Sequence, residues 1–239
     1  MGNLLDEPKV ASVLAELHEL SDRQLRSLRP LSVARRLGAR LGLPVDLDRP
    51  VVRKLLSDKL VALDRDKGRL CYLLCRVASA RRIVEVGTSC GVSTIYLAAA
   101  VRENGGNGIV IGTEWEPAKV AAACENLDRA GLANVVDICE GDVRETLRDV
   151  GRPIDFVLMD IWAPMARPVL DLLIPQLRPG AMVLCDNVER FRFDYRHYLD
   201  RVRDPRGDFR STTLPYDGGF ELSVWLASAN RPLRTVGQW

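Results

Sequence analysis

The chain has 239 residues, of which 47% are hydrophobic and 28% are charged, a balance typical of a globular protein with one sizeable core. The formal net charge of +2 gives no general attraction to nucleic acid or membranes, and no apolar run is long enough to span a bilayer. The N-terminus lacks the layout of a signal peptide, and six cysteines without a C-x-x-C pair indicate buried free thiols in a reducing compartment. We therefore expect a soluble, cytoplasmic protein that binds neither nucleic acid nor membrane.

The first 80 residues carry the spacing of amphipathic helices. Asp6-Glu7-Pro8 form a start signal ahead of a helical face made by Val10, Val13, Leu14 and Leu17. Ser21 and Gln24 are spaced like a capping box, which predicts a second helix beginning there. Further helical patterns cover 33–41, 50–63 and 70–77, the last with an apolar face of Leu70, Leu73, Leu74 and Val77. We expect residues 1–66 to form a helical lid that belongs to the same domain as residues 67–239.

From residue 82 onward, apolar runs alternate with helical patterns. The predicted strands are 82–86, 109–114, 135–139, 154–160 and 181–186, and the helices between them are 91–102, 117–130, 143–150 and 165–177. Repeated strand–helix units of this kind predict a parallel, doubly wound sheet whose strands are buried on both faces. After a helix near 193–203, strands 209–214 and 220–227 are joined through Asp217-Gly218-Gly219, a hairpin signal. The predicted fold class is therefore α/β, with a mostly parallel, Rossmann-like sheet of seven strands and an N-terminal helical lid.

Residues 83–93 form the most informative segment. The first predicted strand ends near Glu85, Gly87 and Gly91 follow, and a helical pattern comes next. A loop that leads into a helix N-terminus suits a carboxylate or phosphate, and Glu85 suits an ammonium group on the same ligand. Dinucleotide sites use G-x-G-x-x-G with an acid about 20 residues on, whereas here the spacing is G-x-x-x-G and Glu114 lies 27 residues beyond Gly87. The pattern predicts a site for S-adenosylmethionine (SAM), with Glu114 at the ribose hydroxyls.

Polar residues stand at or near the end of each of the five predicted parallel strands, where ligands bind in open α/β sheets. The series is Glu85, Glu114, Asp142, Asp160 and Asp186-Asn187. Trp115 is a candidate to cover an adenine ring, and Gly141-Asp142 either meets the polar edge of that ring or places Asp142 as a helix cap. The oxygens of Asp160, Asp186 and Asn187 suit Mg²⁺, which would lower the pKa of an acceptor hydroxyl and orient it.

These motifs carry a family resemblance. From about Lys67 to Ala227 the chain resembles the class I SAM-dependent O-methyltransferases, within them the catechol and caffeoyl-CoA O-methyltransferases. The matching segments are Lys67-Gly68-Arg69, V-E-V-G-T-S-C-G-V-S at 84–93, M-D-I-W at 159–162 and R-P-G-A-M-V-L-C-D-N-V at 178–188. The resemblance implies a seven-stranded sheet, SAM as methyl donor and Mg²⁺ on Asp160, Asp186 and Asn187. It also implies that Ser89 and Ser93 contact the methionine carboxylate and that 61–65 gates the acceptor site. The predicted cofactor-binding residues are Glu85, Gly87, Thr88, Ser89, Gly91, Ser93, Glu114, Trp115, Gly141, Asp142, Asp160 and Trp162.

One position departs from the family pattern. Those enzymes carry a lysine just past the strand-four aspartate as general base, and here Ala163 stands in its place. Alanine cannot accept the hydroxyl proton, so the metal acidifies the hydroxyl alone, another base among His197, Tyr195 and His18 acts, or the acceptor is already an anion. We name His197 as the catalytic candidate beside Asp160, Asp186 and Asn187.

The predicted function is O-methyl transfer from SAM to a small-molecule acceptor, with Mg²⁺ at a hydroxyl and a possible homodimer. The alternative is metal-independent methylation of a carboxylate. Two rival classes have weaker support. The glycine spacing argues against a nicotinamide-dependent oxidoreductase. The strand-end acids argue against a catalytically silent interaction subunit, although the missing lysine permits one.

Overall fold

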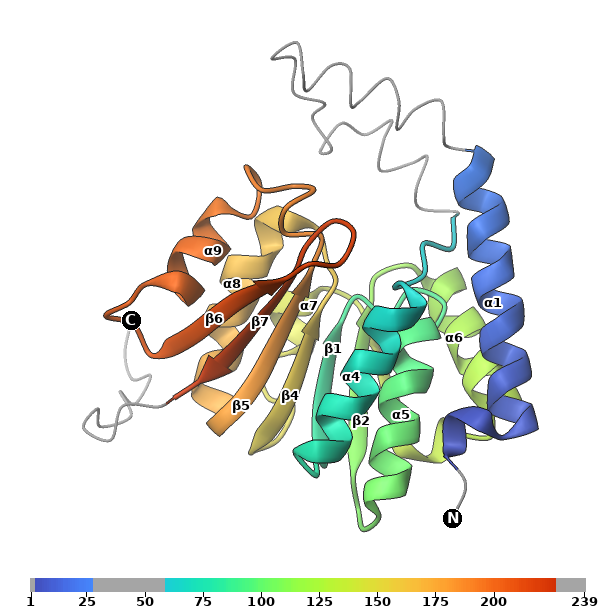
Figure 1. Ribbon diagram of the computed structural model, residues 1–239. Helices are drawn as coiled ribbons and strands as arrows, with labels where there is room; N and C mark the ends of the chain where they lie inside the picture. Colours follow the sequence, from blue (N-terminus) through green and yellow to red (C-terminus); the bar gives the residue numbers. More distant parts are fainter. Residues whose placement is uncertain (1–2, 28–58, 227–239) are drawn as a thin grey trace.

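The computed structural model describes residues 3–27 and 59–226, which form a seven-stranded sheet with helices on both faces (Figure 1). The strand order is β3-β2-β1-β4-β5-β7-β6. The first five strands pair in parallel, and β7 pairs antiparallel with both β5 and β6. The strands are β1 Arg82–Val86, β2 Ile109–Glu114, β3 Val136–Glu140, β4 Ile154–Met159, β5 Leu177–Asp186, β6 Phe209–Leu214 and β7 Phe220–Trp225. The predicted fold class, including the antiparallel pair at one end, is confirmed.

Two hydrophobic clusters form the core, one on each face of the sheet. On β4, Phe156 and Leu158 belong to the cluster under α1 (Pro8–Ser27), α4 (Arg65–Val77), α5 (Val92–Asn104) and α6 (Pro117–Arg129). Their neighbours Val157 and Met159 belong to the opposite cluster, under α7 (Val143–Thr146), α8 (Ala163–Leu173) and α9 (Arg196–Arg203). Because successive strand residues point to opposite faces, a strand buried on both sides must be apolar throughout. This explains the continuous apolar runs in the sequence.

Short 3-10 turns complete the described elements at η1 (Leu4–Asp6), η2 (Ala133–Val135) and η3 (Ile174–Gln176). None of the helices within residues 3–27 and 59–226 combines the length and the apolar character of a membrane span. All six cysteines are free, but Cys124 is exposed and only Cys71, Cys75 and Cys185 are fully buried. The prediction of buried thiols is therefore correct for half of them.

From residue 82 onward, most predicted boundaries differ from the observed ones by a few residues, and the clearest difference is in α7. The pattern at 143–150 predicts two helical turns, whereas α7 stops at Thr146. The Gln176 side chain donates to the Leu147 carbonyl at 3.0 Å and accepts from Val150 N–H at 3.1 Å. The Gln176 side chain, from the 3-10 turn η3 that follows α8, therefore binds the backbone groups that a longer α7 would have paired within the helix.

The N-terminal region differs most from the sequence prediction. Ser21 and Gln24 do not begin a helix, because α1 runs through both of them. Their side chains instead accept hydrogen bonds from Ala62 N–H (3.0 Å) and Leu60 N–H (2.7 Å). Leu60 and Leu63 are buried but not helical, contrary to the predicted helix at 50–63. The rest of that helix and the one at 33–41 lie outside the described residues.

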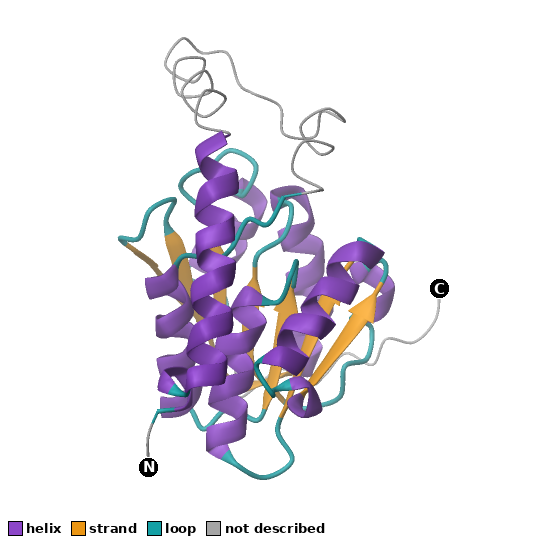
Figure 2. Ribbon diagram, turned by 90° about the vertical axis from the view of Figure 1, so that its right-hand side faces the viewer, coloured by secondary structure: helices purple, strands orange, loops and turns teal. Residues whose placement is uncertain are grey.

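The position of α1 does not match the predicted lid. It packs against α5 and α6, on the outer side of the helical layer that covers one face of the sheet (Figure 2). Its apolar residues Val10, Val13 and Leu17 enter the core cluster on that face. The helix therefore extends the hydrophobic core, and the short segment 59–64 is the part of the described N-terminal region that reaches the sheet edge.

Helix α4 forms as predicted but buries a different face. Leu73 and Val77 are 55% and 86% exposed, whereas Lys67, Gly68 and Cys71 are buried. The reason is Gly68, because a Cβ there would lie 2.7 Å from the ring of Tyr96 in α5. The absent side chain lets the two helices approach closely, and this contact turns the Lys67 side of α4 inward.

Candidate functional site

The first glycine turn lies tightly between the ends of β1 and β4. Gly87 has a φ of +96°, and a Cβ there would collide with the carbonyl oxygen of Asp160. The N–H groups of Gly87 and Thr88 donate to the carbonyl of Thr113 at 3.2 and 2.9 Å, which ties the turn to β2. Only glycine fits at position 87, so the loop predicted between the first strand and the helix is a tight turn.

Glu85 is fully buried beneath this turn and one of its oxygens lacks a partner. Its Oε2 accepts hydrogen bonds from Thr88 (3.0 Å) and Thr94 (2.5 Å). Its Oε1 makes no hydrogen bond to any of the residues that the structure describes. Burial raises the pKa of the carboxyl, while hydrogen bonds from Ser93, Thr94 and Thr88 act in the opposite direction. A buried acceptor without a donor is costly, so this oxygen is suited to an ammonium group or another donor on a ligand.

Glu114 turns its carboxylate back onto nearby backbone. Its Oε2 accepts from Ser89 N–H at 2.8 Å, and its Oε1 accepts from Trp115 N–H at 2.8 Å and Glu116 N–H at 3.0 Å. The side chain thus links the end of β2 to the turn that contains Ser89, which itself has a φ of +49°. Since each carboxylate oxygen has about two lone-pair positions, Oε2 keeps one for a ligand hydroxyl and Oε1 keeps none.

At the ends of β4 and β5, Asp186 accepts hydrogen bonds from three donors. Its Oδ1 accepts from Lys67 Nζ at 2.5 Å and from Asn187 N–H at 2.7 Å, and its Oδ2 accepts from Asn187 Nδ2 at 2.9 Å. Asn187 has a φ of +61°, which asparagine tolerates better than most residues. Asp160 N–H donates to the carbonyl of Val86 at 3.0 Å, so Asp160 is placed beside the glycine turn.

The carboxyls at this edge crowd one another. Burial, together with the nearby Asp186 and Glu85 carboxyls, raises the pKa of Asp160 to about 8, and the Lys67 ammonium opposes this rise. Burial also raises the pKa of Asp186, again against Lys67. One ammonium, that of Lys67, therefore stands near the buried Glu85 and Asp186 and the half-buried Asp160, so the site favours additional positive charge.

The other predicted site residues have mixed outcomes. Asp142 caps α7 by accepting from Arg144 N–H at 2.9 Å and also pairs with the Arg144 side chain, so the helix-cap alternative is observed. Trp115 is 62% exposed beside Glu114. Gly91 begins α5 with a φ of +85°, Gly141 follows β3 with a φ of +127°, and Trp162 precedes α8.

Of the three candidate bases, Tyr195 lies near the strand-end acids, whereas the described contacts of His197 and His18 lie elsewhere. His197 is exposed on α9, where its carbonyl accepts from Arg167 at 3.3 Å. Tyr195 donates its hydroxyl to the carbonyl of Ile161 at 3.0 Å, and burial raises its pKa well above the usual value. His18 pairs with the Tyr96 hydroxyl at 3.1 Å, and burial lowers its pKa to about 4. The selection of His197 as catalytic candidate thus has no geometric support.

A small cavity of about 10 Å³ joins the glycine turn to the N-terminal region. It is lined by Leu60, Val61, Ala62, Leu63, Gly87, Thr88, Ser89, Cys90, Val92, Ser93 and Asp160. Its volume is about that of one water, because the segment 60–63 lies directly over the turn. The cavity is therefore smaller than the predicted SAM site requires, and a larger ligand needs the segment 60–63 to move aside.

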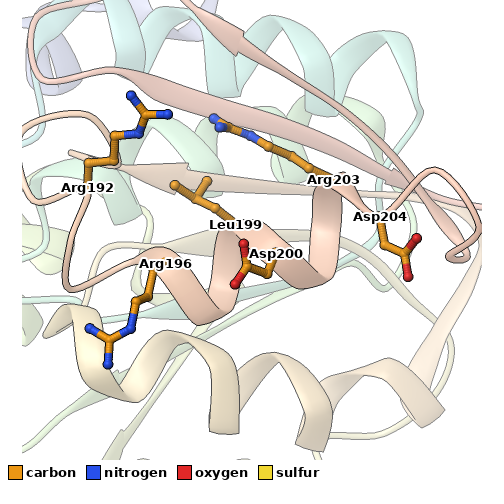
Figure 3. Close-up of a pocket in the computed structure, with 6 residues that line it drawn as sticks. All are labelled: Arg192, Arg196, Leu199, Asp200, Arg203 and Asp204. Carbon is orange, nitrogen blue, oxygen red and sulfur yellow. The ribbon is translucent and has the colours of Figure 1, made fainter.

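A larger cavity, of about 520 Å³, lies elsewhere, on the surface of α9 (Figure 3). It is lined by Arg192, Arg196, Leu199, Asp200, Arg203 and Asp204, and by none of the strand-end acids. Arg203 already forms a two-point ion pair with Glu221, with both contacts at 2.7 Å. With two aspartates among three arginines, this cavity has little net charge to select a ligand.

Comparison with known proteins agrees with this geometry. Residues 84–188 match the family model described as a methyltransferase domain. The chain is 33% identical over 134 residues to a catechol O-methyltransferase of Niastella koreensis and 35% identical over 131 residues to one of Mycobacterium tuberculosis. The resemblance to class I SAM-dependent O-methyltransferases is confirmed. The alignments cover 54% of this chain, which spans 59% and 58% of these curated relatives.

Solved structures extend the similarity over more of the chain. TomG from Streptomyces achromogenes, an O-methyltransferase involved in tomaymycin synthesis and solved with SAM, is 25% identical with a TM-score of 0.64. That alignment covers 88% of this chain and 99% of TomG. A methyltransferase from Geobacter sulfurreducens is 26% identical with a TM-score of 0.61, covering 80% and 97%. The Rossmann-like methyltransferase fold is therefore shown beyond the matched domain.

Lys67 is the residue whose part in the site was missed by the sequence reasoning. Its motif, Lys67-Gly68-Arg69, is visible in the sequence, but nothing local indicates that the ammonium reaches Asp186, which is 119 residues away. The apolar pattern of α4 predicts the wrong buried face, so the sequence does not indicate that Lys67 points inward.

Proposed function

We propose that this chain transfers a methyl group from SAM to an oxygen of a small-molecule acceptor. The observation that carries the proposal is the fully buried Glu85, whose Oε1 has no partner among the described residues, directly beneath a glycine turn. SAM has an ammonium, a carboxylate and a ribose diol. Glu85 Oε1, the backbone around Ser89 and the free position on Glu114 Oε2 offer complementary groups at one sheet edge.

The chain's own contribution is positioning and exclusion of water. When bound, SAM supplies an electrophilic methyl group on a sulfonium whose positive charge disappears during transfer. The acids at the strand ends surround the place where that charge would sit, and Leu60–Leu63 close over it. A positioned acceptor in a dry site gains most of its rate from orientation.

We also propose that Asp160, Asp186 and Asn187 hold Mg²⁺ when the acceptor is a hydroxyl. Their oxygens are the donors that Mg²⁺ prefers, and the Asp160 and Asp186 carboxyls lie close enough at this edge to influence each other's charge. No group of three or more His, Cys, Asp or Glu side chains among the described residues could hold a metal, so the set depends on the Asn187 amide oxygen. The bound metal would lower the pKa of the acceptor hydroxyl.

A second candidate, methylation of a carboxylate, is favoured by the absence of a positioned base. Ala163 is buried where the related enzymes carry lysine, and the described contacts of His197 and His18 lie away from the strand-end acids. Tyr195 lies near these acids, but burial raises the pKa of its hydroxyl well above the usual value, so it stays protonated at neutral pH and cannot accept a proton. A carboxylate is already deprotonated at neutral pH, so it needs no base.

The test is methyl transfer from SAM labelled in the methyl group, with matched pairs of acceptors that carry either a vicinal diol or a carboxylate on the same aromatic ring. Labelled ether or labelled ester identifies which acceptor oxygen reacts. Calorimetric titration with S-adenosylhomocysteine provides a reading independent of the acceptor. If neither SAM nor S-adenosylhomocysteine binds, the proposed function is wrong.

A further inference from the structure

Lys67 joins three parts of the chain that are distant in sequence. It lies in the first turn of α4 and is only 3% exposed. Its Nζ donates to Asp186 Oδ1 at 2.5 Å and to the carbonyl of Asp217 at 2.6 Å, across 119 and 150 residues. Phe220 in β7 lies 5.6 Å from the ammonium, measured to the ring centroid. One buried charge therefore connects α4, the end of β5 and the turn between β6 and β7.

The helix that carries Lys67 is held firmly in place. Asp64 caps α4 by accepting from Asp66 N–H at 2.9 Å and Lys67 N–H at 3.4 Å. Gly68 lets α4 lie against the Tyr96 ring, whose hydroxyl forms a hydrogen bond with His18 Nε2 at 3.1 Å. The backbone on both sides of Lys67 is therefore held in place by contacts that do not involve the Lys67 side chain.

The β6–β7 turn, residues 215–219, rests on the segment that follows β5. Glu189 N–H and Arg190 N–H both donate to the carbonyl of Gly218, at 2.9 and 3.0 Å. A Cβ on Gly218 would lie 2.5 Å from Asn187 Oδ1, so the turn backbone touches a proposed metal ligand directly. The Asp217 side chain also pairs with Arg190. Turn and segment therefore form one unit, to which Lys67 attaches α4.

We propose that Lys67 is a positioning residue for the acceptor side of the site: it locks Asp186, Asn187 and the 215–219 turn into the arrangement that receives the acceptor. This proposal rests on the proposed function and adds a residue to it. A side chain that merely filled the core would need no ammonium, whereas here two directional bonds hold a carboxylate and a backbone carbonyl at once. A small displacement of an acceptor is enough to lower a transfer rate by about 100-fold.

The experiment compares Lys67→Met, which keeps the length and removes the charge, with Arg69→Met as the matched control. Arg69 lies on the same helix turn but is exposed, and within the part of the chain that the structure describes its ion pair is with Asp66, at 3.5 Å. In Lys67→Met we expect amide exchange at Glu189, Arg190 and Gly219 to speed up by about tenfold or more. We also expect kcat/KM for the acceptor to fall by about 100-fold while Kd for SAM stays within about twofold. Arg69→Met should match the wild type in all three measurements.

Two results would overturn the proposal. One is unchanged amide exchange in the turn of Lys67→Met, and the other is a loss of SAM affinity as large as the loss in acceptor kcat/KM. If Lys67→Met fails to fold because Asp186 is left buried without a partner, Lys67→Met with Asp186→Asn removes both charges, and its turn amides must still exchange faster. The exchange measurement requires no acceptor, so a wild-type protein that methylates nothing would refute the proposed function separately.

Discussion

The buried pair of His18 and Tyr96 predicts how stability depends on pH. His18 is 4% exposed, its Nε2 lies 3.1 Å from the Tyr96 hydroxyl, and burial followed by the nearby Arg65 lowers its pKa from 6.5 to about 4. The folded protein therefore keeps this imidazole neutral at pH values where the unfolded chain is protonated. As pH falls through 6.5, the unfolded state begins to take up a proton that the folded state refuses, and the loss of stability continues until the folded pKa of about 4 is reached.

The size of this effect follows from the shift. Each pKa unit corresponds to about 1.4 kcal/mol, so a shift from 6.5 to about 4 gives an upper limit of about 3.5 kcal/mol lost between these two pH values. The contribution is fully present above 6.5. Carboxyl groups titrate in the same range, so the His18 part appears only as a difference between two proteins.

The assay is urea unfolding of the wild type and His18→Gln across this pH range. Glutamine keeps a hydrogen-bonding group near Tyr96 but has no charge to gain. We expect the free energy of unfolding of the variant to fall less than that of the wild type below pH 6.5, with a difference of up to about 3.5 kcal/mol at the acid end. Parallel pH profiles for the two proteins would refute the argument, because they would mean that His18 takes up its proton equally well in the folded and unfolded states.

Three further predictions concern the site and its support. Glu114→Ala should weaken SAM binding by about 1–3 kcal/mol, because it removes the free acceptor position on Oε2 and the hydrogen bond from Ser89 N–H. Calorimetric titration compares this variant with the control Glu116→Ala. Equal affinities for SAM in the two variants would count against the assignment of Glu114 to the ribose. Gly68→Ala should destabilise the fold by about 1–3 kcal/mol, because the new Cβ would lie 2.7 Å from the buried Tyr96 ring. This overpacking outweighs the better helix propensity of alanine. A urea unfolding midpoint equal to or higher than that of the wild type would contradict the prediction. Chelation with EDTA should suppress transfer to a hydroxyl acceptor, measured as labelled ether, because no lysine stands at Ala163 to accept the proton; full activity in the chelator would favour the carboxylate acceptor.

The sequence by itself determined the layered α/β architecture. The strands at 82–86 and 109–114 were predicted at their observed positions, because a strand buried on both faces must be apolar along its whole length and its end is marked by a polar residue or glycine. The edge strand at 209–214 is only partly buried, and the hairpin signal after it marked its position. The strand-end acids could be placed at one edge of the sheet, because the carboxyl ends of parallel strands meet there. The glycine turn at Gly87 was visible because no other residue satisfies its positive φ and close backbone contact.

Only the tertiary structure decided which partners the polar side chains take. Ser21 and Gln24 have the spacing of a helix start, but they bind the backbone of Ala62 and Leu60, 41 and 36 residues away. The apolar face of α4 suggests that Leu73 and Val77 are buried, yet the glycine contact at Gly68 turns Lys67 inward instead. A hydrogen bond between residues more than 100 positions apart, such as that of Lys67 with Asp186, leaves no periodic trace in the sequence. Periodicity records which side of an element is apolar, whereas the pairing of buried charges depends on how elements pack in three dimensions.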